Sequence, residues 1–344
     1  MVFRAVLAGC GSMARGWIKA LLEHPELIGR VDLVGLVDID AKAAETLRDA
    51  FGLTGVLTGT DLSEVLTATK PDLLFDVVIP AARRDVVANG LSYGCHVLSE
   101  KPMAISMDGA RDLVRLSVET GKIHAVMQNR RFNLGVRRIR RLIENGALGT
   151  LTGVHADFFI GAHFGGFREQ MRNVLLLDMA IHTFDAARFM SGKQPIAVYC
   201  HESNPPGSWN AHGAAANAIF EMSDGVAFTY RGSWVAEGAP TNWDSSWRII
   251  GTDGTLLWDG ADQFEARTLV GTEGFLRPLA ALEVPPPQDE GQTHGHASVI
   301  ADFLAALEDN RPPETVGSDN IKSLAMVFGA IESAAAKARV EIAI

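Results

Sequence analysis

Short apolar runs alternate with helix-like stretches through the first third of the chain, and this alternation constrains the fold most. The runs are continuous rather than alternating with polar residues, which is typical of strands covered on both faces. Parallel strands need a helix between them, so repeated strand–helix units predict a doubly wound parallel sheet. The predicted strands are residues 2–9, 31–40, 56–58, 73–80, 95–102 and 123–130.

The pattern changes after about residue 150. Strand candidates now follow one another through short turns, such as those at 223–225 and 252–254. Turns this short join antiparallel neighbours, so an antiparallel sheet domain with closing helices is predicted. The strand candidates are 151–160, 196–203, 214–222, 225–235, 243–251 and 254–260. The predicted helices are 174–190, 296–309 and 318–338, with a linker at 285–292.

Composition excludes several classes of protein. Hydrophobic residues make up 47% and charged residues 21%, as in a soluble globular protein. The net charge of −10 disfavours general binding to nucleic acid or to anionic membranes. The three cysteines are far apart and predict neither a disulfide framework nor a Cys-x-x-Cys metal site. Because the N-terminus does not resemble a cleavable signal and no long apolar run is present, we expect a cytoplasmic protein.

A G-x-G-x-x-A sequence lies between the first predicted strand and the following helix. Gly9 permits a tight turn, Gly11 lets the backbone approach a pyrophosphate, and Ala14 permits close packing of helix on strand. The start of the helix, at Ser12 and Met13, offers N–H donors to phosphates. This arrangement predicts a dinucleotide site.

Asp38 ends the second predicted strand, where an acidic side chain can bind the adenosine ribose hydroxyls. The same carboxylate would repel a 2′-phosphate, and no Arg or Lys directly follows it, although Lys42 lies one helical turn further on. Asp38 could alternatively be a helix N-cap. We predict NAD as the cofactor rather than NADP.

Two further motifs carry candidate catalytic groups. Glu100-Lys101-Pro102 follows a predicted strand, at the carboxyl edge of the sheet where ligands bind in open α/β folds. Asp178 and His182 are four residues apart in a predicted helix, so both project from one face of it.

With these three motifs in this order, the sequence resembles the glucose-fructose oxidoreductase / inositol dehydrogenase / MocA (Gfo/Idh/MocA) family over nearly its whole length. The resemblance implies an α/β fold, with an N-terminal Rossmann domain at 1–128. It also implies an α+β domain at 129–344 with a large, mostly antiparallel, open-faced sheet. The implied activity is NAD(P)-dependent hydride transfer between a secondary hydroxyl or ketone of a sugar, sugar acid or inositol and the nicotinamide.

The resemblance also implies roles for individual residues. Lys101 would polarise the reacting oxygen and stabilise developing alkoxide charge. His182 would be the acid/base, since an imidazole with a pKa near about 6.5 suits removal of a hydroxyl proton. Asp178 would orient a substrate hydroxyl or the catalytic groups. The implied cofactor contacts are Gly9, Gly11, Ser12, Met13, Ala14, Asp38, Ile79, Pro80, Glu100, Lys101 and Arg168.

The chain departs from the family pattern at two places. The family often has Thr-Pro-Asn and a histidine after the fourth strand, whereas this chain has Ile-Pro-Ala-Ala-Arg-Arg at 79–84. The family often has Trp-Arg before the D-x-x-x-H motif, and Phe167-Arg168 stands in its place. Arg168 is therefore a candidate to face the nicotinamide or the substrate.

Weaker signals concern substrate and partners. Arg130, at the end of the last predicted Rossmann strand, and His163, just beyond a strand of the second domain, are candidate substrate contacts. The arginines at 137, 138, 140 and 141 are expected on a solvated helix face. A sheet with one helix-covered face must hide the other, so a homodimer or homotetramer joined through this sheet is expected. His294 and His296 lack further ligands at suitable spacing, and no metal site is predicted.

Two alternatives remain open at this point. Relatives of this kind include enzymes that retain NAD and cycle it internally, as redox-cycling glycosidases and epimerases do. The chain could also be a non-catalytic dinucleotide sensor. The joint presence of Lys101, Asp178 and His182 favours an enzyme, because a sensor needs no acid/base pair.

Overall fold

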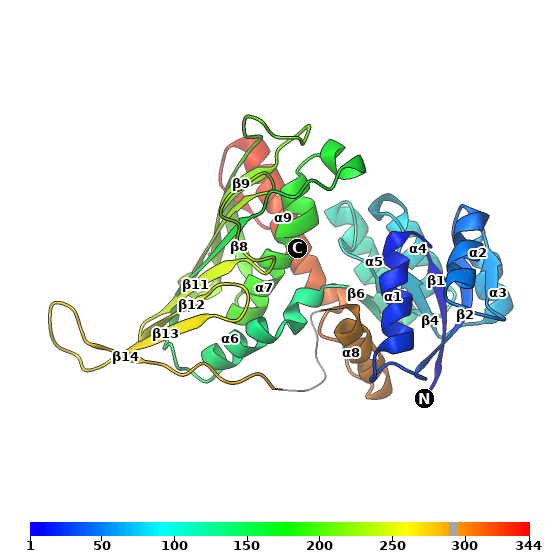
Figure 1. Ribbon diagram of the computed structural model, residues 1–344, viewed down its shortest axis with the longest axis horizontal. Coiled ribbons are helices and arrows are strands. Elements are labelled where there is room, and N and C mark those ends of the chain that lie inside the picture. Colours follow the sequence, from blue (N-terminus) through cyan, green and yellow to red (C-terminus); the bar gives the residue numbers. More distant parts are fainter. Residues whose placement is uncertain (289–294) are drawn as a thin grey trace. The chain divides into compact units, whose positions relative to one another are not determined.

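The computed structural model describes residues 1–288 and 295–344, which form two compact units with one sheet each (Figure 1). The first unit comprises Met1–Phe132 and the described residues from Gly295 to Ile321. The second comprises Asn133–Gln288 and Lys322–Ile344. The predicted linker at 285–292 lies partly outside the described residues.

The first unit contains a six-stranded parallel sheet in the order β3-β2-β1-β4-β5-β6. The strands are β1 (Phe3–Ala8), β2 (Val31–Val37), β3 (Leu57–Gly59), β4 (Leu73–Asp76), β5 (His96–Ser99) and β6 (His124–Val126). The helices between them are α1 (Ser12–Glu23), α2 (Ala41–Ala50), α3 (Leu62–Thr69), α4 (Pro80–Ser92) and α5 (Met107–Thr120). Separate apolar clusters cover the two faces of the sheet. The predicted doubly wound parallel sheet is confirmed.

Helix α8 (His296–Glu308) belongs to the first unit and not to the second, to which the division at residue 128 assigned it. It packs on α1, and its Phe303 and Leu304 are fully buried in the same cluster as Trp17 of α1. The short helix η1 (Asn129–Phe132) also stays with this unit because Phe132 is buried in that cluster. The chain therefore returns to the first unit after leaving it, which its linear order does not reveal.

The second unit contains a nine-stranded sheet in the order β14-β13-β12-β11-β7-β10-β9-β8-β15. The central pair β7 and β10 is parallel and the other neighbours are antiparallel, so the sheet is mostly antiparallel as predicted. The predicted strands are β7 (Leu151–Phe159), β8 (Pro195–Ser203), β9 (Ala215–Met222), β10 (Ala227–Ser233), β11 (Ser246–Gly251) and β12 (Gly254–Trp258). The strands that the sequence did not predict are β13 (Phe264–Leu269), β14 (Leu279–Ala281) and β15 (Val340–Glu341).

Helices cover one face of this sheet and leave the other exposed (Figure 1). They are α6 (Leu134–Glu144), α7 (Ile181–Ser191) and the part of α9 (Gly317–Ala336) that belongs to this unit. Every residue of α7 is buried. Its Phe184 packs edge-on against Phe220 and Tyr230 of the sheet, with ring centroids 4.8 and 5.2 Å away. On β9, by contrast, Ile219 points to the other face and is 55% exposed.

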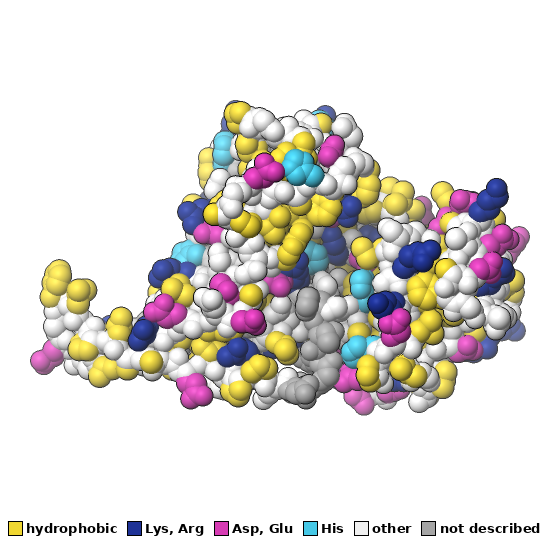
Figure 2. Space-filling model, viewed as in Figure 1, with side chains coloured by type: hydrophobic (Ala, Val, Ile, Leu, Met, Phe, Trp, Pro, Cys, Tyr) yellow, Lys and Arg dark blue, Asp and Glu magenta, His cyan; other side chains and the backbone are white. Residues whose placement is uncertain are grey.

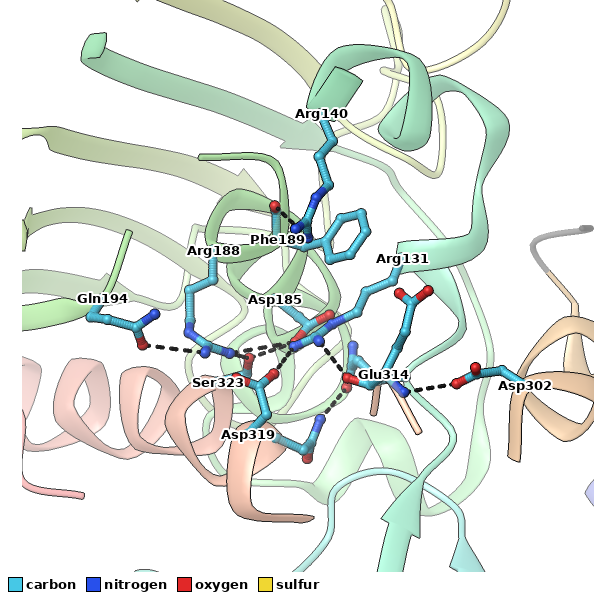
Figure 3. A network of polar contacts seen from close by, with 12 residues as sticks. Arg131, Arg140, Asp185, Arg188, Phe189, Gln194, Asp302, Glu314, Asp319 and Ser323 are labelled. Carbon is cyan, nitrogen blue, oxygen red and sulfur yellow. Dashed lines mark hydrogen bonds and ion pairs between the residues drawn. The ribbon is translucent and has the colours of Figure 1, made fainter. Parts of the chain in front are cut away.

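The arginines of α6 do not form the solvated face that the sequence predicted. Arg137 and Arg140 lie over the ring of Phe189, at 5.0 and 4.3 Å, and Arg138 lies 4.2 Å over the ring of Phe264. Figure 3 shows Arg140 beside Phe189, whose carbonyl oxygen it also contacts. The prediction was wrong because these guanidinium groups lie over aromatic rings and, at Arg138 and Arg140, also donate hydrogen bonds to the carbonyl oxygens of Pro285 and Phe189.

The aromatic contacts of Phe184 generate a stability prediction. Phe184→Ala removes the ring that joins α7 to the sheet, so the free energy of unfolding should fall by about 3–5 kcal/mol. Phe275→Ala is the matched control, because Phe275 is fully exposed between β13 and β14. Figure 2 shows hydrophobic side chains at the tip of this hairpin. It should change stability by less than about 0.5 kcal/mol. Urea unfolding followed by circular dichroism measures both, and equal losses would contradict the packing described.

Candidate functional site

The phosphate loop has the local geometry that its glycines predict. Gly9 has φ +94°, and a Cβ there would lie 2.6 Å from the carbonyl carbon of Val77, so only glycine fits. At Gly11 none of the described residues places a heavy atom within 4 Å of a Cβ position, so the backbone is open to approach. Ala14 is fully buried against the sheet, which permits the close helix–strand packing expected.

The start of α1 is arranged to receive an anion. Gly11 occupies the N-cap position and makes no side-chain bond to the first turn. The N–H groups at the start of the helix therefore receive no cap from it, and the helix dipole favours negative charge there. Ser12 and Met13, the first two residues of α1, are exposed.

Asp38 directly follows β2 and lies beside the phosphate loop. Its Oδ2 accepts a hydrogen bond of 2.7 Å from the Cys10 backbone N–H, and its Oδ1 accepts one of 3.0 Å from Asp40 N–H. A cleft of about 430 Å³ lies next to the loop. The cleft is lined by Cys10, Gly11, Ser12, Arg15, Asp40, Lys42, Ala43, Thr46 and Leu47. An open glycine cradle, a helix start and a carboxylate at the end of β2 together fit the adenosine diphosphate half of a dinucleotide.

Glu100 directly follows β5 and is buried with a fully partnered carboxylate. Its Oε1 accepts hydrogen bonds from Trp17 Nε1 at 2.9 Å and from His296 at 3.3 Å, while Oε2 accepts from the Lys101 backbone N–H at 3.2 Å. Burial favours a raised pKa, but the bonds from His296 and Trp17 outweigh it and hold the pKa of Glu100 below its usual range. These contacts favour a supporting role over the direct cofactor contact that we predicted for Glu100.

Trp17 and His296 were not identified from the sequence as parts of the site. Trp17 looks like any core residue of an amphipathic helix, and it is fully buried. His296 was considered only as a metal ligand, yet it lies 5.7 Å from the Trp17 ring and hydrogen-bonds Glu100. No sequence signal links it to Glu100, because the two residues are 196 positions apart.

The loop after β4 places Ile79 and Pro80 at the start of α4. Ile79 is the N-cap residue of that helix and is 70% exposed, and Pro80 is its first residue. A proline suits this position because its missing N–H would be unpaired there anyway. Both residues lie at the carboxyl edge of the parallel sheet, where ligands bind in this class of fold.

In the second unit, Asp178 is paired with Arg168. Asp178 Oδ2 accepts a hydrogen bond of 2.9 Å from Arg168 Nε. The guanidinium of Arg168 lies 5.3 Å from the ring of Phe164 and 5.0 Å from that of Phe167, which fixes its plane. The sequence made Arg168 and Asp178 separate candidates for site residues, and the structure pairs them.

The segment before α7 is a π-helix, η3 (Leu175–Ala180), where a single α-helix was predicted over 174–190. Asp178 lies in this wider turn and His182 is the second residue of α7, with 9% of its surface exposed. π-Helical turns are rare and are frequently found at functional sites. Helix α7 is anchored from its far side, where Arg188 and Asp185 both hydrogen-bond Ser323 of α9 (Figure 3).

The two weaker substrate candidates have different surroundings. His163 is exposed, stacks on Trp209 with ring centroids 3.7 Å apart, and pairs with Glu237 at 3.0 Å. Arg130 lies in η1 and is partly buried. Its neighbour Arg131, which the sequence did not single out, is buried and holds Glu314 and Asp319 (Figure 3). Arg131 therefore has a structural role within the first unit.

The predicted site residues thus divide between the two units. The phosphate loop, Asp38, the Ile79–Pro80 turn, Glu100, Lys101 and Arg130 belong to the first unit. Arg168, Asp178, His182 and His163 belong to the second.

The exposed face of the second sheet carries a shallow cavity of about 860 Å³. Strand register places one row of side chains across this face, namely Tyr199, Ile219, Thr229, His155, Arg248, Leu257 and Glu265. His155 Nδ1 bonds Thr229 Oγ1 at 2.6 Å, and Asp157 pairs with Arg231 in the neighbouring row. His155 and Asp157 share a face, as the alternation of the strand predicts.

Cys10, Cys95 and Cys200 are free and buried. In the part of the chain that the structure describes, no three His, Cys, Asp or Glu side chains form a group that could hold a metal ion. His294, considered above, lies outside the described residues. None of the helices in residues 1–288 and 295–344 is long and apolar enough to cross a membrane.

Two family models match successive parts of the chain. Residues 3–128 match a family described as "Oxidoreductase family, NAD-binding Rossmann fold". Residues 136–257 match the "GFO/IDH/MocA C-terminal domain".

Individual relatives are distant but match the full length. The chain is 24% identical to D-apiose dehydrogenase of Paraburkholderia graminis, over 99% of this chain and 90% of that protein. It is 23% identical to inositol 2-dehydrogenase of Rhizobium meliloti, over the whole of both chains. Among solved structures, an oxidoreductase from Agrobacterium radiobacter, in complex with NAD+, L-tartaric acid and magnesium, has the same fold. Its TM-score is 0.85 at 20% identity, covering 99% of each chain.

The position of Asp38 predicts the effect of replacing it. Asp38→Ser should weaken NADH binding about 10- to 100-fold, since the ribose and the Cys10 N–H both lose a carboxylate partner. The preference for NADH over NADPH should also shrink, because the carboxylate of Asp38, which would repel a 2′-phosphate, is removed. Nicotinamide fluorescence titration measures both affinities. Asp32→Asn, at an exposed residue near the beginning of β2, is the control and should leave them unchanged.

Proposed function

The chain belongs to the glucose-fructose oxidoreductase / inositol dehydrogenase / MocA family, and on that premise we propose how this NAD-dependent oxidoreductase works. It interconverts a secondary hydroxyl and a ketone on a sugar, sugar acid or inositol. The observation that carries the proposal is Lys101 at the carboxyl edge of a parallel sheet whose phosphate loop and Asp38 fit NAD. The names of the dehydrogenase relatives support the substrate class.

The cofactor is held by residues of the first unit. The backbone at Gly9, Gly11 and the start of α1 receives the pyrophosphate, and Asp38 receives the adenosine ribose. The Ile79–Pro80 turn of this unit borders the remainder of the cofactor, and Arg168 of the second unit is a further proposed contact to it. Bound NAD supplies the acceptor for the hydride that the substrate carbon loses on oxidation.

Lys101 and His182 share the work at the substrate oxygen. The Lys101 ammonium donates a hydrogen bond to the reacting oxygen and stabilises the negative charge that develops there. A ring nitrogen of His182 accepts the hydroxyl proton on oxidation and returns it on reduction. Asp178, held by Arg168, orients a neighbouring substrate hydroxyl. Arg130 and His163 are the proposed outer contacts to the substrate.

Replacing Lys101 tests this assignment. Lys101→Ala should lower kcat/KM by about 100- to 1,000-fold, because one preorganised electrostatic contact to the developing charge is lost. NADH affinity should change less than about threefold, since the phosphate loop and Asp38 are intact. Nicotinamide absorbance with a panel of inositols, aldoses, sugar acids and glycosides measures turnover, with NAD and NADP in parallel. Lys19→Ala, an exposed lysine of α1, is the control.

The outcomes of this assay separate the alternatives. Equal loss of turnover and of NADH binding in Lys101→Ala would contradict the role of Lys101. Turnover with NADP only would contradict the assignment of Asp38. An absence of net turnover, together with NAD released on denaturing the protein, would favour an enzyme that cycles its cofactor internally.

We also propose that the protein is located in the cytoplasm.

The exposed face of the second sheet is the proposed surface for a homodimer or homotetramer. Tyr199 and Ile219 expose apolar surface beside the shallow cavity. Ile219→Asp should therefore shift the molar mass measured by light scattering toward that of one chain. The control is Ile28→Asp, an exposed position in the first unit that should leave the mass unchanged. An unchanged mass for Ile219→Asp would contradict this interface.

A further inference from the structure

A charged pair is buried under the loop where the chain departs from the family pattern. Arg83 lies in the first turn of α4 and is 1% exposed, and Asp76 is the last residue of β4 and is 0% exposed. Arg83 Nε donates a hydrogen bond of 2.9 Å to Asp76 Oδ2. Burying two charges is costly unless their remaining donors and acceptors are also paired, so this pair calls for a specific explanation.

The other nitrogens of Arg83 reach two further backbone segments. Nη1 donates to the carbonyl oxygen of Pro102 at 2.7 Å, and Nη2 donates to the carbonyl oxygen of Val78 at 2.6 Å. The remaining carboxylate oxygen of Asp76 accepts from Val78 N–H at 3.1 Å. One guanidinium thus joins the end of β4, the loop leading into α4, and the turn that follows β5.

That last turn contains Lys101, which is therefore fixed on both sides. Before it, Glu100 is anchored by Trp17 and His296 and accepts the Lys101 backbone N–H. After it, the Pro102 carbonyl is anchored by Arg83. The direction of a long flexible side chain depends on the backbone that carries it. Here the Lys101 N–H and the carbonyl of the next residue, Pro102, are both bonded to buried charged side chains.

We propose that Arg83, held by Asp76, is a positioning residue that fixes the Lys101 side chain for catalysis through the Pro102 carbonyl. The inference rests on the proposed function of Lys101. A planar guanidinium can donate hydrogen bonds to Asp76, Val78 and Pro102 at once. A lysine at the same place offers a single ammonium, which cannot reach all three acceptors. Arg83 thereby supports the site in the loop where the asparagine and histidine of the family pattern are absent.

The conservative variant Arg83→Lys tests the proposal, because it keeps the positive charge beside Asp76 and loses the separate donors that bind Val78 and Pro102. We expect kcat to fall about 10- to 100-fold, as a small misplacement of a catalytic group can produce. The KM for substrate and the affinity for NADH should change less than about threefold. Arg84→Lys, at the exposed neighbouring arginine, is the matched control and should leave kcat unchanged.

A second measurement reports on Lys101 without relying on turnover. Its amine is labelled with a limiting amount of acetic anhydride across a range of pH, and the labelled peptides are quantified by mass spectrometry. Arg83→Lys should change the rate or the pH midpoint of labelling at Lys101 and leave Lys19 unchanged. If Lys101→Ala retains full turnover, the proposed function fails, while the labelling result still decides whether Arg83 positions Lys101.

A double variant guards against a folding defect. Arg83→Met with Asp76→Leu replaces the buried pair by apolar side chains of similar size, which preserves stability in many proteins. Loss of kcat with NADH binding retained, and altered labelling of Lys101, would support the proposal. Full kcat in this double variant would overturn it, and so would a parallel loss of kcat and NADH binding with unchanged Lys101 labelling.

Discussion

The hydrogen-bond ladder of the parallel sheet determines where the candidate site lies. The hydrogen bonds continue for one residue beyond the strand ends. The N–H groups of Gly9, Val77 and Glu100 donate to the carbonyl oxygens of Val37, Ala8 and Asp76, respectively. Because parallel strands end at the same edge, the residues that follow β1, β2 and β5 are brought to one line. The phosphate loop, Asp38 and the Glu100–Lys101 segment therefore owe their proximity to backbone pairing rather than to side-chain attraction.

The second unit meets a different constraint, because helices cover only one face of its sheet. The covered face buries aromatic side chains against α7, which carries His182, and the far side of α7 is tied to α9 through Ser323. A helix buried at every residue has little freedom to move, so it suits the acid/base role proposed for His182. The exposed face, with its shallow cavity, is the surface proposed above for contact between subunits.

Local sequence patterns predicted those features that depend on interactions between residues close together in the chain. The strand–helix alternation, the glycines of the phosphate loop and the carboxylate of Asp38 lie where they were expected, because each depends on a few adjacent residues. Contacts distant in sequence were not predicted. Helix α8 packs on α1, His296 hydrogen-bonds Glu100, and Arg83 hydrogen-bonds Pro102. No motif or residue spacing in the sequence indicates these contacts. The π-helix before α7 and strands β13 to β15 were also missed, since they depend on their neighbours in the fold.

Hydrogen transfer to the cofactor is the most direct test of the central claim, that this protein is an NAD-dependent oxidoreductase acting on hydroxylated carbon. The protein would be incubated with NAD and perdeuterated myo-inositol, glucose and gluconate in turn, and the nicotinamide then analysed by mass spectrometry after denaturation. The account predicts that one deuterium appears on the nicotinamide ring with at least one of these compounds, and that Lys101→Ala reduces its rate of appearance. An unlabelled nicotinamide with every compound, in a protein that binds NAD, would contradict it.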